Sequence, residues 1–171
     1  NAQLNKTGYD NYDDVTTKGT KALSVNDVKQ LLQNTNAIIL DVRKPQEFAT
    51  EHIPNSIFIG IDGQFAPWVG ALITDLKQAI ILVTPNGREQ EAVMRLSRVG
   101  YDNCIGFVDG GVDAWKQAGN ATSSILSITA DEFSGKLSNS TLDVLDVRKP
   151  GEYDSGHLCS VNSNPLDFIT D

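Results

Sequence analysis

The stretch LDVRKPQEF at positions 40–48 decides the fold of this chain, because it occurs again as LDVRKPGEY at positions 145–153. Every residue of the second copy lies 105 positions after its counterpart, and the same offset relates His52 to His157. A repeat of this length exceeds the units of solenoid proteins and has the size of a small domain. The sequence therefore predicts one whole domain followed by the beginning of a second copy.

Strand-like and helix-like segments alternate along the first copy. Apolar runs of strand length, rich in Ile and Val, occupy positions 38–42, 79–83 and 104–108, and helical patterns occupy 28–32, 65–76, 91–96 and 112–117. Such continuous runs are typical of strands buried on both faces of a parallel sheet. Their alternation with helices indicates an α/β sheet with right-handed crossovers. Ser24 and Thr129, each three positions before an acidic residue, are predicted to begin helices.

Composition and charge exclude several classes of function. The 171 residues include 14 Lys and Arg against 22 Asp and Glu, which gives a formal net charge of −8 at pH 7. This acidity argues against nucleic acid or an anionic membrane as the main partner, and no apolar run approaches the roughly 18 residues of a membrane span. The two cysteines, Cys104 and Cys159, fit neither a disulfide framework nor a zinc pattern. We therefore expect a reducing, cytoplasmic location.

The loop that follows the apolar run 79–83 is the candidate binding site. It consists of Thr84, Pro85, Asn86, Gly87, Arg88 and Glu89. Ligands of open parallel sheets bind where strands end and helices begin, and backbone N–H groups at such a turn can hold an anion together with the helix N-terminus. The residues alone leave two alternatives open, an ordinary connection or a binding cradle.

Two groups of motifs resemble a rhodanese domain. The stretches LDVR at 40–43, EF at 47–48 and EHIP at 51–54 resemble its front half, and GY at 100–101, VDGGVDAW at 108–115 and AG at 118–119 resemble its back half. The resemblance implies a rhodanese-like three-layer α/β fold with a central parallel sheet at 23–120. It also implies that residues 128–171, after a linker at 121–127, form the N-terminal half of a second rhodanese-like repeat.

Rhodaneses are sulfurtransferases, and the resemblance equates Thr84 with the cysteine that carries their persulfide. A thiolate is both a nucleophile and a sulfur carrier, whereas a threonine hydroxyl stays protonated near neutral pH and cannot store sulfane sulfur. Cys104 begins a strand that we expect to be buried, and Cys159 aligns with Pro54 of the first copy. We therefore predict no catalytic residue in this chain and only a degenerate cradle at 84–89.

The remaining motif residues are expected to support the fold. Arg43 and Glu47 lie four positions apart, as do Arg148 and Glu152, and this spacing favours an ion pair or a hydrogen-bonded loop brace over catalysis. Two histidines and two distant cysteines do not supply the three or four ligands of a zinc site. The structural set comprises Asp41, Arg43, Glu47, His52, Gly110, Gly111, Trp115, Asp146, Arg148, Glu152 and His157.

A narrower resemblance concerns the context of the domain. The loop 85–91, the insertion 62–68 and the leader 8–19 resemble rhodanese modules attached C-terminally to metallo-β-lactamase-fold hydrolases, including glyoxalase-II-like and persulfide-dioxygenase-like proteins. The resemblance implies that residues 1–22 are a leader from an upstream metallo-hydrolase domain, and that any zinc or iron belongs to that domain. This chain, with no cofactor of its own, is then expected to be a fragment.

Two functions follow as alternatives. The first is a non-catalytic rhodanese-like module that serves packing, dimerisation or docking within a metal-dependent hydrolase or persulfide-processing enzyme. The second is a sulfurtransferase whose catalytic cysteine lies in a part of the second repeat outside this chain. A phosphatase-like relative is disfavoured, because it would also need a loop cysteine. Since the strand expected at 142–147 would expose unpaired edges on its own, we expect it to pack on the first domain or to form a homodimer.

Overall fold

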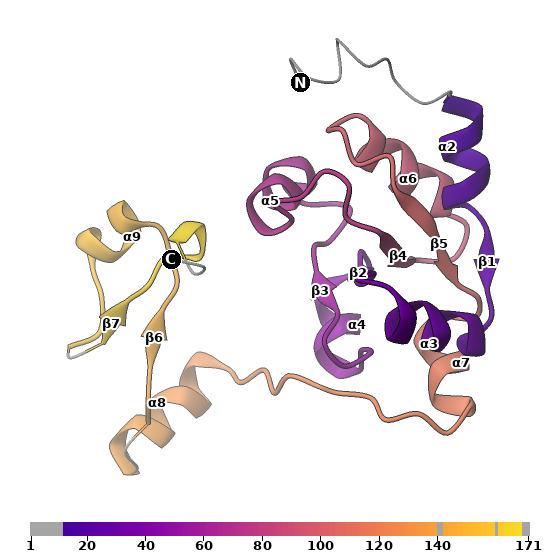
Figure 1. Cartoon of the computed structure of the whole chain (residues 1–171). Helices are drawn as coiled ribbons and strands as arrows, with labels where there is room; N and C mark the ends of the chain where they lie inside the picture. Colours follow the sequence, from indigo (N-terminus) through magenta and orange to yellow (C-terminus); the bar gives the residue numbers. More distant parts are fainter. Residues whose placement is uncertain (1–11, 140–141, 160, 169–171) are drawn as a thin grey trace. The chain divides into compact units, whose positions relative to one another are not determined.

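The computed structural model describes residues 12–139, 142–159 and 161–168, which belong to two compact units (Figure 1). Unit 1 ends at Leu126 and unit 2 begins at Ser127. The larger unit carries the central sheet, and the smaller one carries the second copy of the repeated motif.

The sheet of unit 1 has five parallel strands in the order β1-β5-β4-β2-β3. The strands are β1 (Ala22–Leu23), β2 (Ile38–Asp41), β3 (Ile57–Phe58), β4 (Ile80–Val83) and β5 (Cys104–Val108). All four residues of the central strand β4 are buried, as expected of a strand covered on both faces. The α/β fold and the parallel sheet predicted from the apolar runs are confirmed.

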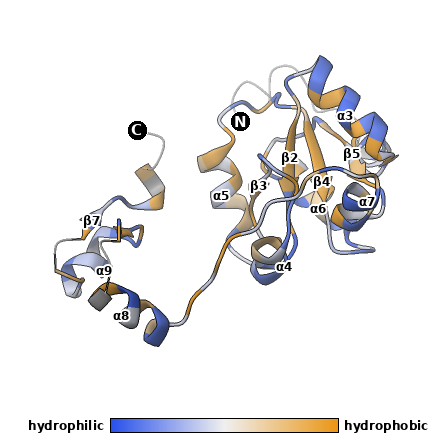
Figure 2. Cartoon of the chain, turned by 90° about the horizontal axis from the view of Figure 1, so that it is seen from below, coloured by the Kyte–Doolittle hydropathy of each residue, from blue (hydrophilic) through white to orange (hydrophobic). Residues whose placement is uncertain are grey.

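Helices cover both faces of this sheet and produce three layers. They are α2 (Tyr12–Gly19), α3 (Val25–Asn34), α4 (Pro45–Thr50), α5 (Phe65–Leu72), α6 (Glu89–Ser97) and α7 (Gly111–Gln117). Leu40 and Leu82 pack with residues of α2, α5 and α6, whereas Ile39 and Ile81 pack with residues of α3 and α7. Successive strand residues point to opposite faces, so each strand supplies both cores. Figure 2 shows the hydrophobic strands β2 and β4 among helices with hydrophilic stripes.

Two helix boundaries illustrate how side chains set the ends of elements. Ser24 accepts the backbone N–H of Asp27, whose carboxylate accepts the Ser24 N–H in return, so the predicted N-cap of α3 is confirmed. The helix predicted at 65–76 instead ends at Leu72. Asp75 accepts the backbone N–H of Lys77 at 2.8 Å, and this local turn competes with a further helical turn.

The described part of the predicted leader packs within unit 1. Val15 of α2 is buried in the core, and a Cβ placed on Gly19 would lie 2.7 Å from Val93 of α6. Strand β1 pairs with β5, where Leu23 lies opposite Val108. The sequence of residues 12–22 is mostly polar because few of their side chains enter the core. The first eleven residues of the leader lie outside the described residues.

The first part of the predicted linker 121–127 is also attached to unit 1. Ser123 and His52 exchange two backbone hydrogen bonds of 2.8 and 2.9 Å, and Ile125 donates its N–H to the carbonyl of Ala49 at 2.8 Å. These contacts fix the chain beside α4. The next residue, Leu126, is 82% exposed.

Unit 2 repeats the strand register of the first copy. It contains α8 (Ala130–Asn139), β6 (Leu145–Asp146), α9 (Pro150–Ser155), β7 (Asn162–Ser163) and the short helix η1 (Leu166–Phe168). Leu145 lies opposite Asn162 in the parallel pair β6-β7, just as Leu40 lies opposite Ile57 in β2-β3. The other edge of β2 is covered by β4, whereas β6 has no strand on that side among the described residues. The cap predicted at Thr129 is confirmed by its reciprocal hydrogen bonds with Glu132.

Candidate functional site

The loop 84–89 connects the end of β4 to the start of α6 and lines a pocket of about 600 Å³. Residues 109–110, which follow β5, and residues 111–113 at the start of α7 also line this pocket, and Arg43 and Glu47 complete the wall. All these segments follow the carboxyl ends of neighbouring parallel strands, the edge at which open α/β sheets bind ligands. The structure therefore brings most of the predicted cradle into one pocket with the end of the first motif.

A carboxylate from α6 lies inside the loop. Glu89 Oε1 accepts the Thr84 hydroxyl at 3.2 Å and the backbone N–H of Gly87 at 3.0 Å. Gly87 has φ +81°, a left-handed conformation that favours glycine, and a Cβ there would meet nothing within 4 Å. The glycine is therefore required by backbone conformation and not by space. Sequence reasoning placed Glu89 in the cradle but did not predict that it would bind the loop itself.

Arg88, which the sequence placed in the cradle, does not line the pocket and binds other acids. Its guanidinium binds Asp62 at 2.7 and 3.0 Å and Glu91 at 2.8 and 3.1 Å, and Arg88 is not among the pocket-lining residues. Hydrogen bonds to Asp62 and then Glu91 raise the pKa of Arg88. The same contacts lower the pKa values of both carboxyl groups. The nearest cation of the loop is thus already paired.

The charges that line the pocket are mostly negative. Four carboxylates face one cation, Arg43; the acidic lining residues are Glu47, Glu89, Asp109 and Asp113. Asp109 and Asp113 are absent from the predicted site residues, although the position of Asp109 directly after the strand 104–108, at the ligand-binding edge, was a usable signal. The predicted Gly110 and Gly111 also line the pocket, with φ values of 68° and 59°.

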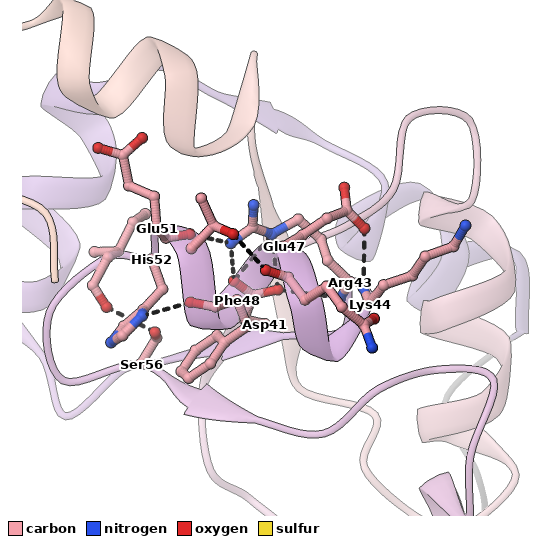
Figure 3. Close-up of polar contacts among 11 residues, drawn as sticks. Asp41, Arg43, Lys44, Glu47, Phe48, Glu51, His52 and Ser56 are labelled. Atoms are coloured by element: carbon pink, nitrogen blue, oxygen red, sulfur yellow. Dashed lines mark hydrogen bonds and ion pairs between the residues drawn. The ribbon is translucent and has the colours of Figure 1, made fainter. Parts of the chain in front are cut away.

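Asp41 and Arg43 form a largely buried brace at the end of β2 (Figure 3). The Asp41 side chain is fully buried, and Arg43 binds it through the backbone N–H at 3.0 Å, through Nε at 3.0 and 3.1 Å, and through Nη2 at 2.7 Å. Arg43 Nη2 also donates to the carbonyl oxygen of Glu51 at 2.8 Å. The guanidinium therefore ties the end of β2 to the end of α4.

Arg43 forms no ion pair with Glu47, and Arg148 forms none with Glu152, although the partners of each pair lie four positions apart. Glu47 accepts the backbone N–H of Lys44 at 3.1 Å, and Glu152 accepts that of Lys149 at 3.1 Å. Each glutamate thereby caps the helix that begins after the lysine. Of the two alternatives for Arg43, an ion pair with Glu47 or a loop brace, the structure has the brace to Asp41.

The rings of His52 and Trp115 in the first copy serve packing. The His52 ring is buried, stacks on Phe48 with centroids 3.9 Å apart, and places Nδ1 2.8 Å from the Phe48 carbonyl oxygen. Trp115 is 8% exposed, and its Nε1 donates to Ala121 O at 2.9 Å. Neither side chain lines the pocket.

Unit 2 reproduces this local geometry at offset 105. Arg148 binds Asp146 at 2.6 Å and donates to the Gly156 carbonyl at 2.9 Å. The hydrogen bonds that the Arg148 side chain and backbone donate to Asp146 lower the pKa of that carboxyl group. His157 stacks on Tyr153 with centroids 3.8 Å apart. Burial differs between the copies, because the Arg148 side chain is 46% exposed and that of Arg43 only 14%.

Neither cysteine belongs to the pocket. Cys104 is fully buried at the start of β5, and burial raises the pKa of its thiol to about 12, whereas Cys159 is exposed. We predict that iodoacetamide modifies Cys159 alone in the folded chain and both cysteines in denaturant, as mapped by mass spectrometry. Rapid native modification of Cys104 would contradict its burial.

The described residues contain neither a metal-binding cluster nor a membrane-spanning helix. No group of three or more His, Cys, Asp and Glu side chains there is arranged to hold a metal ion. No helix in that part of the chain combines the length and apolarity needed to cross a membrane.

The fold and the pocket define a rhodanese-like domain. A family model described as Rhodanese-like domain matches residues 24–118, so this chain belongs to the rhodanese-like domain family. The match begins at the N-cap of α3 and ends just after α7. It therefore contains the whole of the pocket.

Two protein relatives differ in how much of them this chain covers. Thiosulfate sulfurtransferase GlpE of Pseudomonas syringae pv. syringae (strain B728a) is 31% identical over 88 residues, which cover 51% of this chain and 79% of GlpE. The uncharacterized protein slr1261 of Synechocystis sp. (strain ATCC 27184 / PCC 6803 / Kazusa) is 30% identical over 99 residues, which cover 56% of this chain and 51% of that protein. The chain thus spans about half of the second relative.

Solved structures agree on the fold. The Alr3790 protein from Anabaena sp. superposes with a TM-score of 0.53 at 21% identity, over 68% of this chain and 92% of that chain. Thiosulfate sulfurtransferase from Pseudomonas aeruginosa gives a TM-score of 0.52 at 24% identity, over 89% of this chain and 36% of that chain. At these identities the likeness shows the fold alone.

Proposed function

We propose that this rhodanese-like module does not transfer sulfur and serves as a packing, dimerisation or docking part of a larger enzyme. The observation that carries the proposal is the residue at the end of β4. The hydroxyl of Thr84 stands where the family resemblance expects a thiolate, and it donates to Glu89. A sulfur carrier must be a good nucleophile and a good leaving group in turn, and a threonine hydroxyl is neither.

No other thiol of the described chain replaces the missing nucleophile. Cys104 is buried in β5 with a raised pKa, and Cys159 belongs to unit 2. Neither lines the pocket. The chemistry therefore fails at its first step, the attack of a thiolate on the sulfur donor.

The proposed context is a fusion with an upstream metallo-β-lactamase-fold hydrolase, which would hold any zinc or iron. The support is that two segments carrying this narrower resemblance contact each other. Arg88 of the loop 85–91 binds Asp62 of the insertion 62–68 at 2.7 Å. The insertion thus forms an ion pair with the loop whose other residues line the pocket. Dimerisation or docking would use the edge of β6, where Leu145 is 49% exposed.

A second candidate function is sulfur transfer by a completed second repeat. The observation that favours it is the copied geometry of unit 2, whose strand register and Asp146–Arg148 brace match those of unit 1. In this alternative, a strand equivalent to β4 follows residue 171 in a longer protein, and the loop after that strand carries the reactive cysteine.

A thiosulfate-to-cyanide sulfur transfer assay tests the proposal. We expect this chain to form thiocyanate no faster than a buffer blank, because it lacks the thiolate that must accept the sulfane sulfur. The GlpE protein of Pseudomonas syringae is the positive control. Turnover above the blank that scales with protein concentration would refute the non-catalytic function. Turnover that appears only in a chain extended past residue 171 would favour the second candidate.

A further inference from the structure

We propose that the Glu89 carboxylate keeps small oxyanions such as thiosulfate or sulfate out of this pocket. It accepts the Gly87 N–H, the hydrogen-bond donor of the loop that such an anion would need. The inference deepens the proposed loss of sulfur transfer and rests on it. It adds that the change at position 84 is not the only barrier, because the loop is also closed to the donor.

The geometry of the loop carries the proposal. Amides in a turn that precedes a helix attract anions, and the helix dipole adds to that attraction. In this loop the Gly87 N–H and the Thr84 hydroxyl converge on one oxygen of Glu89, at 3.0 and 3.2 Å. Pro85 has no N–H, and the Arg88 N–H donates to the Pro85 carbonyl at 3.1 Å. An external anion would have to displace the carboxylate to reach Gly87.

The charges around the loop favour the same result. Thiosulfate is a dianion, and the pocket wall contains three further carboxylates, from Glu47, Asp109 and Asp113. The cation that lines the pocket, Arg43, is already bound to Asp41 at 2.7 Å, and Arg88 of the loop is bound to Asp62 at 2.7 Å. Among the residues that line the pocket, an incoming anion therefore meets repulsion from carboxylates and no cation without an acidic partner.

A direct consequence concerns the restored nucleophile. The thiolate introduced by Thr84→Cys would attack the sulfane sulfur of thiosulfate, break the S–S bond and release sulfite with the bonding electron pair. Cyanide would then attack the outer sulfur of the persulfide, form thiocyanate and return the thiolate. Both steps balance without an oxidant or reductant. The first step needs thiosulfate in the pocket, so Thr84→Cys alone is expected to remain slow.

Anion binding with Thr84 in place is the first test. Calorimetric titration of the full chain with sodium thiosulfate, and with sulfate, compares the wild type with Glu89→Ala. We expect Glu89→Ala to bind at least about tenfold more tightly, the size of one hydrogen bond gained to a charged group. The Gly87 amide should shift in NMR spectra on titration of the variant. Equal affinities in the two proteins would overturn the proposal.

Two matched variants distinguish the effect of occupying the Gly87 N–H from the effect of negative charge in the pocket. Glu89→Gln removes the charge but keeps an oxygen that can accept the Gly87 N–H, so its affinity should lie between those of the wild type and Glu89→Ala. Glu47→Gln removes the same charge from the pocket wall and leaves the loop contacts in place, so its gain should be smaller still. A gain from Glu47→Gln equal to that from Glu89→Ala would show a general field effect and overturn the proposal.

Sulfur transfer is the second test, made in a Cys159→Ser background so that the exposed thiol does not contribute. We expect Thr84→Cys/Glu89→Ala to form thiocyanate at least about tenfold faster than Thr84→Cys, and mass spectrometry should find the added sulfur atom at position 84. Equal rates of the two variants would overturn the role of Glu89 and leave the proposed function intact. Turnover by the wild type would overturn the proposed function, while the binding test would still decide the role of Glu89.

Discussion

Replacing Asp41 by alanine is expected to destabilise unit 1 by about 3–5 kcal/mol. The carboxylate is fully buried and receives four hydrogen bonds from Arg43, whose side chain is only 14% exposed. Asp41→Ala leaves that guanidinium without its counter-charge, and the remaining bond to the Glu51 carbonyl does not compensate for it. Urea unfolding followed by tryptophan fluorescence measures the loss.

The repeat supplies a matched control for this prediction. Both tryptophans of the sequence lie in unit 1, so their fluorescence does not report on unit 2. Asp146→Ala breaks the same motif where Arg148 is 46% exposed, and it should leave the tryptophan-detected transition unchanged. The double variant Asp41→Ala/Arg43→Met removes both charges and should lose less than Asp41→Ala. If Asp41→Ala proves as stable as the double variant, or more stable, the cost does not come from an unpaired buried charge.

The brace also shows why part of this structure was predictable from sequence. Its partners are two positions apart, and the helix cap at Glu47 spans three, so all the contacts form within one short segment. Unit 2 contains the same contacts in a different environment, since Arg148 is far more exposed than Arg43. Local spacing therefore specifies this geometry, and the rest of the domain decides only how deeply it is buried.

The contacts that were not predicted connect segments far apart in the chain. Arg88 and Glu89 are adjacent in the sequence, yet one turns outward and the other turns into the loop. The outward turn is fixed by Asp62, which lies 26 positions earlier on a different segment. No periodicity in the loop reveals that partner. The position of the pocket could be predicted because a helix follows the strand 79–83, whereas the binding of Glu89 to the loop could not.

The packing of residues 12–23 on unit 1 was not predicted for a related reason. Helix α2 and strand β1 contribute few buried side chains, among them Val15 and Leu23, and the hydrophobic pattern of their segment is correspondingly weak. Their attachment depends instead on a backbone-to-backbone approach. The Phe107 N–H donates to the carbonyl of Lys21 at 3.0 Å, which brings the chain before β1 directly against β5.

Gly106→Ala is expected to cost unit 1 about 3 kcal/mol or more, because this close approach leaves no room for a side chain. Gly106 has φ +145°, and a Cβ there would lie 2.6 Å from the Lys21 carbonyl oxygen and 2.8 Å from Leu23. It also lies beside a register shift between β4 and β5, a setting in which strand glycines recur. Backbone strain and overpacking each cost about 1–3 kcal/mol. Urea unfolding measures the sum.

The same substitution tests whether residues 12–23 are part of the domain. If β1 is displaced from β5, α2 loses its anchor, so trypsin should cleave folded Gly106→Ala after Lys18 or Lys21 faster than the wild type. Gly70→Ala is the matched control, because a Cβ on this α5 residue meets nothing within 4 Å and helix propensity favours alanine by about 1 kcal/mol. It should be at least as stable as the wild type and resist trypsin equally. Indistinguishable unfolding of Gly106→Ala and Gly70→Ala would show that β1 is held by something other than its backbone contact with β5.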